Sequence, residues 1–223
     1  MQELLASDFE IVNVLGTADF LSSVALPPGA LVAQVSEGTL EEMGVFQTNR
    51  TALAVARMKP NAPLYPAASE YVLALDDLKD PGNLGTIIRT ADWFGIHKII
   101  ASPSTADFYN PKVISATMGS FTRVQVYYTD LAAFFTKIPQ PVYGAFLEGT
   151  DVHTVAFQKS GCVLIGSESH GISPGLLPFV SHKITIPRFG QAESLNAATA
   201  TAIICDNLRT AGDVSHGPPG PFQ

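Results

Sequence analysis

Residues 71–95 read YVLALDDLKDPGNLGTIIRTADWFG and decide the fold of this chain. The stretch opens with an unbroken apolar run, Tyr71–Leu75, which is typical of a strand buried on both faces. A polar loop follows, and apolar residues then recur from Leu84 at helical spacing. We expect a helix over 84–94, with Asn83 as its cap and Gly95 at its end. A buried strand that leads into a helix is the repeating unit of a parallel α/β sheet.

The same alternation continues along the chain. Further strands are predicted at 98–101, 124–128, 142–146, 163–165 and 183–186. A helix begins at Asn110-Pro111, an asparagine cap with proline in the first turn. Other helices are predicted at 131–137, 173–179 and 195–211, the last of them capped by Ser194. The pattern predicts an α/β fold with a mostly parallel sheet and helices on both faces.

A proline-rich stretch at 59–70 marks a domain boundary. Before it we expect a small α/β domain, with strands at 9–15, 31–35 and 51–58. Its helices are predicted at 18–25, capped by Thr17, and at the capping-box spacing of Thr39 and Glu42. Residues 3–5 resemble the tail of a helix, so we expect this domain to be truncated at its start. The predicted organisation is 1–59 for this domain, 60–68 for a linker, 69–212 for the main domain and 213–223 for a Pro/Gly-rich tail.

Composition narrows the class of protein. Of the 223 residues, 46% are hydrophobic and 15% are charged, which predicts a folded chain with a sizeable core. No apolar run reaches the roughly 18 residues of a membrane span, and the acidic N-terminus shows no secretory signal. Cys162 and Cys205 lie in apolar runs, which indicates buried thiols and a cytoplasmic location. The histidines show no metal-ligand spacing, so we expect no metal.

The net charge of −7 opposes a nucleic-acid partner. A local basic surface can still form on an acidic protein. The residues that could form one are Lys79, Lys112, Arg123, Lys183 and Arg188.

Three polar loops each follow an apolar strand, at 76–85, 166–171 and 187–196. Ligands of open parallel sheets bind beyond the carboxyl ends of the strands, so these loops predict a ligand site. The usual fingerprints are absent, because the sequence contains no G-x-G-x-x-G, no P-loop and no G-x-S-x-G. The residues of these loops alone therefore do not identify the ligand.

Three motif blocks in these loops resemble the SpoU/TrmH family of RNA 2′-O-methyltransferases, in the SPOUT superfamily. The first block is Asn83-Leu-Gly85 with Arg89 and Ala91 downstream. The second is Gly166-Ser-Glu168-Ser-His-Gly171. The third is Ile186-Pro187, followed by Ser194-Leu195-Asn196. The resemblance covers about residues 68–211, and the N-terminal domain is loosely similar to a family substrate-binding domain.

The resemblance implies a SPOUT fold whose C-terminal segment forms a deep trefoil knot. It also implies a homodimer with an active site completed across the interface, S-adenosylmethionine as the cofactor and rRNA or tRNA as the substrate. The reaction implied is methyl transfer to a ribose 2′-hydroxyl.

The catalytic residues that the resemblance implies are Asn83, Arg89, Glu168, Ser194 and Asn196. The family assigns the matching arginine to activating the 2′-hydroxyl. An arginine seldom gives up its proton, so we favour a cation that stabilises the developing alkoxide over a neutral base. Glu168 would position Asn83 or Arg89.

The cofactor-binding positions carried over from the family are mostly backbone contacts. Small and apolar residues suit them, because adenine needs a dry slot with main-chain hydrogen bonds. They are Leu147, Glu148, Gly149, Ile165, Gly166, Ile186 and Leu195.

Two other hypotheses remain open at this stage. An RNA-binding or assembly protein could keep the fold and lose catalysis, although the complete catalytic set opposes this. An unrelated α/β enzyme acting on a small acid would suit the negative charge. Binding of S-adenosylmethionine distinguishes the active RNA 2′-O-methyltransferase from these two alternatives.

Overall fold

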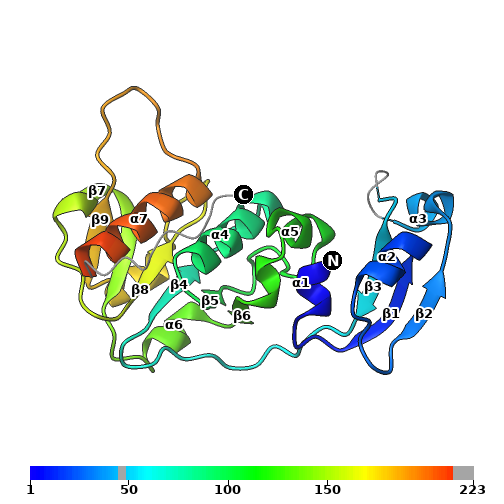
Figure 1. Cartoon of the computed structure of the whole chain (residues 1–223). Coiled ribbons are helices and arrows are strands. Elements are labelled where there is room, and N and C mark those ends of the chain that lie inside the picture. Colours follow the sequence, from blue (N-terminus) through cyan, green and yellow to red (C-terminus); the bar gives the residue numbers. More distant parts are fainter. Residues whose placement is uncertain (45–48, 213–223) are drawn as a thin grey trace. The chain divides into compact units, whose positions relative to one another are not determined.

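The computed structural model describes residues 1–44 and 49–212, so the tail predicted at 213–223 lies outside the described residues. The chain divides into two compact units (Figure 1). Unit 1 comprises residues 1–60 together with 118–123, and unit 2 comprises residues 61–117 and the chain from 124 onward.

Unit 2 contains a six-stranded sheet in the order β6-β5-β4-β8-β7-β9. Every neighbouring pair in this sheet is parallel, which confirms the predicted parallel sheet. The strands are β4 (Tyr71–Leu75), β5 (Lys98–Ala101), β6 (Gln125–Tyr128), β7 (Val142–Asp151), β8 (Gly161–Ile165) and β9 (His182–Thr185).

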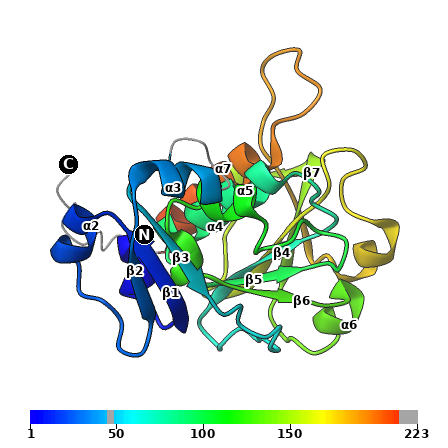
Figure 2. The ribbon, with the colours of Figure 1, turned by 90° about the vertical axis from the view of Figure 1, so that its right-hand side faces the viewer.

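Helices cover both faces of this sheet, as predicted (Figure 2). On one side α4 (Pro81–Trp93) packs against α5 (Pro111–Ala116) and α7 (Ala197–Gly212). On the other side α6 (Leu131–Phe135) and the 3₁₀ helix η3 (Pro174–Phe179) pack together. Because side chains alternate along a strand, residues such as Val72 and Leu164 join Leu131 and Leu176 in one core cluster.

The predicted cap of α4 is wrong. Asp80 caps this helix, because its carboxylate accepts a hydrogen bond from the backbone N–H of Asn83 at 2.7 Å, and Pro81 fills the first turn. Asn83 lies in the first turn of the helix, so its side-chain amide is available for other contacts. Gly95 follows the helix with a φ of +65°, as expected of a glycine at a helix end.

The predicted cap of α7 is also wrong. The helix begins at Ala197, and the side-chain oxygen of Asn196 accepts from the N–H groups of Ala198 and Thr199 at 2.9 and 3.2 Å. Asn196 therefore does what had been expected of Ser194, because a cap must lie directly before the first helical residue.

Unit 1 has a three-stranded sheet in the order β2-β1-β3, with β2 parallel and β3 antiparallel to β1. Thr17 caps α2 as predicted, but Ser36 caps α3, so the expected cap at Thr39 is wrong. Thr39 lies within the helix and donates its backbone N–H to Ser36 at 3.2 Å. The elements are α1 (Gln2–Leu5), β1 (Ile11–Gly16), α2 (Ala18–Ser23), β2 (Leu31–Gln34), α3 (Glu37–Met43) and β3 (Ala52–Ala56).

Residues 118–123 join unit 1 although they lie far along the chain. They include a 3₁₀ turn, η1 (Ser120–Thr122). The ring of Phe121 packs edge-on against Phe9 with centroids 5.7 Å apart, and Arg123 pairs with Glu3.

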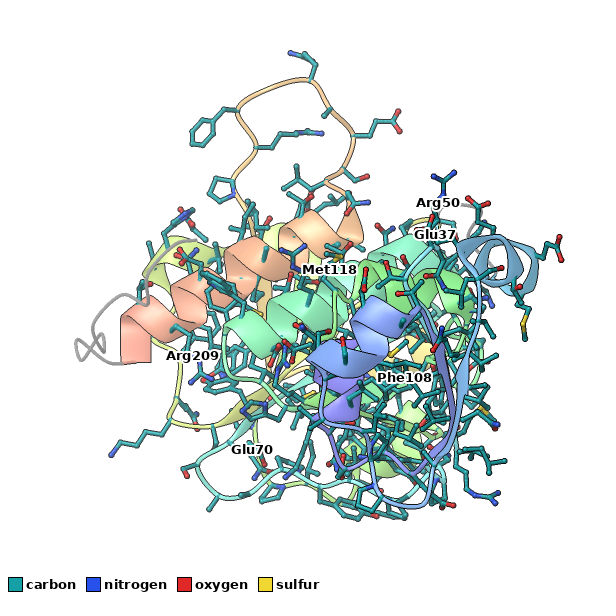
Figure 3. The ribbon with its side chains drawn as sticks, turned by 45° about the vertical axis from the view of Figure 1, so that its right-hand side comes forward. Glu37, Arg50, Glu70, Phe108, Met118 and Arg209 are labelled. Atoms are coloured by element: carbon teal, nitrogen blue, oxygen red, sulfur yellow. The ribbon has the colours of Figure 1, made fainter. Side chains whose placement is uncertain are left out.

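Arg209, which is labelled in Figure 3, connects the C-terminal ends of α4 and α7 by hydrogen bonds. Its guanidinium donates to the backbone oxygens of Phe94 and Gly95 at 2.6 and 2.9 Å, where α4 leaves carbonyl groups without helical partners. Cys162 and Cys205 are buried free thiols, as expected. Among the described residues, no helix is long and apolar enough to cross a membrane.

Candidate active site

Two loops meet in unit 2 where the order of the strands changes direction. β4 and β8 are neighbours, but the chain proceeds from β4 to β5 on one side and returns through β7 on the other. Ligands of open α/β sheets bind at such a switch point, beyond the carboxyl ends of the strands. The loop after β4 leads to Asn83, and the loop after β8 carries Glu168.

Three of the predicted catalytic side chains lie together here. The amide nitrogen of Asn83 donates to a carboxylate oxygen of Glu168 at 2.7 Å. Its amide oxygen accepts from the side-chain nitrogen of Asn196 at 2.8 Å. Asn83 thus links α4, the loop after β8 and the start of α7, and each of its two polar atoms has a partner.

The other two predicted catalytic residues lie apart from this network. Arg89 lies six residues along α4 from Asn83, which is about 9 Å of helix rise. Its side chain is exposed, and neither it nor Ser194 makes a side-chain hydrogen bond within residues 1–44 and 49–212. Arg89 therefore presents an exposed guanidinium that forms no ion pair with a carboxylate of the described residues.

A second link between the two loops was not predicted from the sequence. Asp77 adopts a left-handed backbone conformation with a φ of +56°. Its carboxylate pairs with the ammonium of Lys79 at 2.6 Å and with the ring of His170 at 3.1 Å. We name Asp77, Lys79 and His170 the Asp77 latch. The latch joins the loop after β4 to the loop that carries Glu168, and residues with unfavourable backbone conformations often cluster at functional sites.

The Asp77 latch predicts a pH dependence of stability. The hydrogen bond from Lys79, with smaller contributions from Ser104 and His170, holds the pKa of Asp77 well below its ordinary value. In the unfolded chain this pKa is about 3.9, so the charged carboxylate stabilises the folded state above that pH. The contribution is lost as the pH falls toward the folded-state pKa.

Asp77→Asn should therefore lower the urea midpoint of unfolding at about pH 6, and the deficit should shrink below about pH 4. Asparagine tolerates the left-handed backbone, so the change removes charge rather than geometry. Glu42→Gln, at an exposed carboxylate of unit 1, is the matched control. A deficit that stays constant over this pH range would contradict the assignment.

The predicted cofactor residues 147–149 form a bulge in β7. Both Ala145 and Thr150 align with Ile184 of β9, so the residues between them loop out of the ladder. The hydroxyl of Thr185 donates to the backbone oxygen of Leu147 at 3.0 Å and fixes the bulge against β9. Bulges of this kind are common beside active sites, because they redirect side chains out of the sheet.

Gly166 lies at a very close approach between two segments. A Cβ atom at this position would meet the backbone carbon of Gly171 at 2.2 Å and the nitrogen of Ile172 at 2.4 Å. Ser167 and Gly171 form a bridge that closes the loop around Glu168. Only glycine fits here, and the closed loop places Glu168 opposite Asn83.

The remaining cofactor positions differ in exposure. Ile165 is 2% exposed, so its side chain belongs to the core and its carbonyl accepts from the backbone of Asp76. Leu147 and Leu195 are 75% and 49% exposed, and Ile186 is partly buried. Within the described chain, these apolar side chains are not fully covered. They lie at strand ends, where backbone N–H and C=O groups are also available. This combination fits a flat aromatic ligand such as adenine.

The predicted basic surface is only partly available. Lys79 belongs to the Asp77 latch, and Arg123 lies in unit 1 beside Glu3. The ammonium of Lys183 lies 5.2 Å from the ring centroid of Phe146. Lys112 and Arg188 are exposed.

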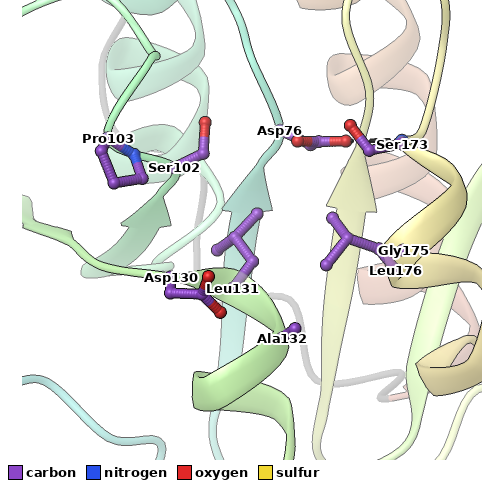
Figure 4. A pocket seen from close by; sticks show the side chains of 9 residues that line it. All are labelled: Asp76, Ser102, Pro103, Asp130, Leu131, Ala132, Ser173, Gly175 and Leu176. Atoms are coloured by element: carbon purple, nitrogen blue, oxygen red, sulfur yellow. Dashed lines mark hydrogen bonds between the residues drawn. The ribbon is translucent and has the colours of Figure 1, made fainter.

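A cavity of about 240 Å³ also lies at the carboxyl ends of the strands, on the side of the sheet that carries α6 (Figure 4). Its polar lining includes Asp76 and Asp130, and its apolar lining includes Leu131 and Leu176. Both carboxylates already have structural partners. Asp76 accepts from the N–H of Ser173, and Asp130 caps α6 through the N–H of Ala133, each at 2.7 Å. The cavity contains none of the predicted site residues, and we assign it no ligand.

Among the described residues, no group of three or more His, Cys, Asp or Glu side chains is arranged to hold a metal ion. A parallel sheet with helices on both faces, and residues of the three motif blocks joined at its switch point, agree with the SPOUT-type methyltransferase class that the motif blocks imply.

Comparisons with known proteins agree with this class. Residues 70–206 match the model of the SpoU rRNA Methylase family. The chain is 32% identical over 213 residues to the 23S rRNA (guanosine(2553)-2′-O)-methyltransferase RlmP of Bacillus subtilis, which covers 94% of this chain and 85% of that protein. The chain therefore belongs to the SpoU rRNA methylase family, and the resemblance drawn from the three motif blocks is confirmed.

Solved structures give the same result. A protein of the TrmH family from Porphyromonas gingivalis is 36% identical, with a TM-score of 0.84 and coverage of 94% of this chain and 86% of that one. The AdoMet-bound rRNA methyltransferase from Sinorhizobium meliloti is 28% identical, with a TM-score of 0.81 and coverage of 91% and 81%. The expected family cofactor, S-adenosylmethionine, is confirmed by such neighbours.

Proposed function

We propose that this chain transfers a methyl group from S-adenosylmethionine to a ribose 2′-hydroxyl of 23S ribosomal RNA. The observation that carries the proposal is the similarity to RlmP, which extends over 94% of the chain and so includes both units. The hydrogen-bonded set of Asn83, Glu168 and Asn196 supports it, because these residues come from the three motif blocks.

The cofactor would be held at the carboxyl ends of β7, β8 and β9. The bulge at 147–149 and the strand end at 165–166 would supply main-chain groups, and Ile186, Leu147 and Leu195 would supply apolar contacts. When bound, S-adenosylmethionine supplies a methyl group on a sulfonium, which is electrophilic without a metal ion. Removing water from this pocket favours a step in which charge is neutralised.

The chain's own residues would orient and stabilise the ribose. Asn83 is held from both sides by Glu168 and Asn196, so its position is fixed before the RNA binds. Arg89, which forms no ion pair among the described residues, would stabilise the developing negative charge on the 2′-oxygen, and the hydroxyl proton is released to bulk solvent outside the closed pocket. Ser194, on the exposed loop before α7, would complete the contacts to the reacting groups.

The proposal includes a homodimer. On α4, Trp93 lies one turn beyond Arg89, and its side chain is 75% exposed. A large aromatic side chain on the exposed face of a helix is typical of the centre of a protein interface. A second copy seated on this face would bring its surface beside Arg89 and complete the site.

Trp93→Lys should therefore weaken dimerisation by about 30-fold or more, since removing an interface hot spot costs about 2 kcal/mol or more. Sedimentation velocity over a range of concentrations measures this effect. Leu177→Lys, at an apolar side chain of η3 that is 40% exposed, is the control and should leave the dimer intact. A wild-type chain that stays monomeric at high concentration would refute the homodimer.

The proposal has three further parts, of which the substrate-binding role and the knot rest on the family resemblance. Residues 1–59 act as an RNA substrate-binding domain joined by a linker at 60–68 to the methyltransferase domain at 69–212. The C-terminal segment of the latter forms a deep trefoil knot. The enzyme works in the cytoplasm, which the buried free thiols Cys162 and Cys205 support.

The function is tested by titrating the purified chain with S-adenosylmethionine and then supplying unmodified 23S rRNA or tRNA transcripts with labelled cofactor. We expect saturable cofactor binding and transfer of label to 23S rRNA. Cofactor binding without transfer to either RNA would instead favour the assembly protein, and no cofactor binding would refute the proposal.

A further inference from the structure

The loop between β9 and α7, residues 186–196, projects from the body of unit 2 (Figures 1 and 2). Phe189 on this loop is 99% exposed, so its phenyl ring contributes nothing to the core. A ring held in water on a projecting loop is available to stack against a planar group of another molecule.

The residue next to this ring is a cation. One guanidinium nitrogen of Arg188 donates to the backbone oxygen of Ala192 at 3.3 Å, which braces the loop across its width. Arg188 is itself an exposed residue. An aromatic ring beside a guanidinium is the combination that binds single-stranded RNA, because bases stack on the ring and phosphates pair with the cation.

The composition of the loop favours RNA over a second protein chain. Apart from Leu195, which is assigned to the cofactor, the exposed residues beside Phe189 on this loop are polar or small: Arg188, Gly190, Gln191, Ala192, Glu193 and Ser194. The centre of a protein interface is a contiguous apolar patch, whereas a stacking platform needs only one ring.

The loop also leads directly into the catalytic network. It ends at Asn196, whose side chain donates to Asn83 at 2.8 Å. A nucleotide bound to the loop would thus be tied through a short, braced segment to the residues that orient the reacting ribose.

We infer that Phe189 stacks on an unpaired nucleobase of the RNA substrate close to the methylated ribose, with Arg188 pairing with a neighbouring phosphate. The inference rests on the proposed function and extends it. It assigns Phe189 to RNA positioning, a role that the three motif blocks do not contain, and it predicts that the modified nucleotide lies in a single-stranded segment.

The test compares Phe189→Ala with the wild-type enzyme on an unmodified 23S rRNA transcript. Stacking on a base predicts that KM for RNA rises about 5- to 150-fold in the variant, while kcat at saturating RNA and the affinity for S-adenosylmethionine stay close to wild type. Phe189→Trp should restore KM, and the transcript should quench its added fluorescence. Leu177→Ala, on η3, is the control and should change none of these values.

Two results would overturn the inference. One is an unchanged KM together with an unchanged Kd for the transcript in Phe189→Ala. The other is loss of the dimer in this variant, which would assign the ring to a second copy of the chain. If the wild-type chain transfers no methyl group, the proposed function fails separately, and the direct Kd and the fluorescence of Phe189→Trp still decide whether the ring stacks on RNA.

Discussion

Arg89→Ala is expected to lower the rate of methyl transfer by about 100- to 1000-fold, the loss that follows removal of one group that stabilises a developing oxyanion. Arg89 is exposed on α4 and has no ionic partner among the described residues, so its full charge is available to the substrate. The same exposure means that the substitution should hardly change the free energy of unfolding. Single-turnover transfer from labelled S-adenosylmethionine measures the effect on the rate.

Two variants sharpen this prediction. Lys137→Ala removes an exposed cation of unit 2 that belongs to none of the proposed sites, and it should leave the rate of transfer unchanged. Arg89→Lys keeps the charge and loses the planar guanidinium, so it should retain part of the activity if the role is electrostatic. Full activity in Arg89→Ala would show that the proposed mechanism is wrong even if the chain methylates RNA.

Gly166→Ala is expected to remove cofactor binding and to lower the free energy of unfolding by about 1–3 kcal/mol. The added Cβ would lie 2.2 Å from the backbone carbon of Gly171, and backbone atoms cannot move aside as a flexible side chain can. The loop would have to open, and opening it withdraws Glu168 from Asn83. Urea unfolding and cofactor titration measure the two effects.

The matched control is Gly175→Ala, because no atom lies within 4 Å of the Cβ position there. This variant should retain wild-type stability and cofactor affinity. A Gly166→Ala enzyme with normal affinity for S-adenosylmethionine would show that the closed loop is not needed for the cofactor site.

Much of unit 2 was predictable because its strands are buried. The predicted bounds of β4 and β5 match the structure, because each strand is a short, mainly apolar run whose ends are marked by polar loops. The true end of β7 was missed. The chain from Leu147 to Gly149 leaves the ladder and residues 150–151 return to β9, and no local apolar pattern signals such a bulge.

The helix caps show a different limit. The sequence contains Asp80-Pro81, the same cap-plus-proline signal that was used at Asn110-Pro111, yet Asn83 was taken as the cap of α4. At α7 the choice between Ser194 and Asn196 depends on which residue directly precedes the first helical turn. Several polar residues can cap a helix, and only the backbone geometry selects one of them.

The candidate site was predictable in part, from the motifs. Asn83, Glu168 and Asn196 do lie together, although 85 and 113 residues separate Asn83 from the other two. The Asp77 latch was missed because it depends on one left-handed residue and on a histidine 93 residues away. Long-range pairs of this kind arise from the order of the strands, which a single sequence does not display.

The position of the transferred methyl group decides whether this chain is a ribose 2′-O-methyltransferase. Unmodified 23S rRNA is incubated with the wild-type chain and S-adenosylmethionine, digested, and mapped by mass spectrometry before and after alkaline hydrolysis. We expect one methylated nucleotide whose 3′ linkage resists alkali, because its ribose 2′-oxygen carries the methyl group. A methyl group on a base, or RNA that gains none, would contradict it.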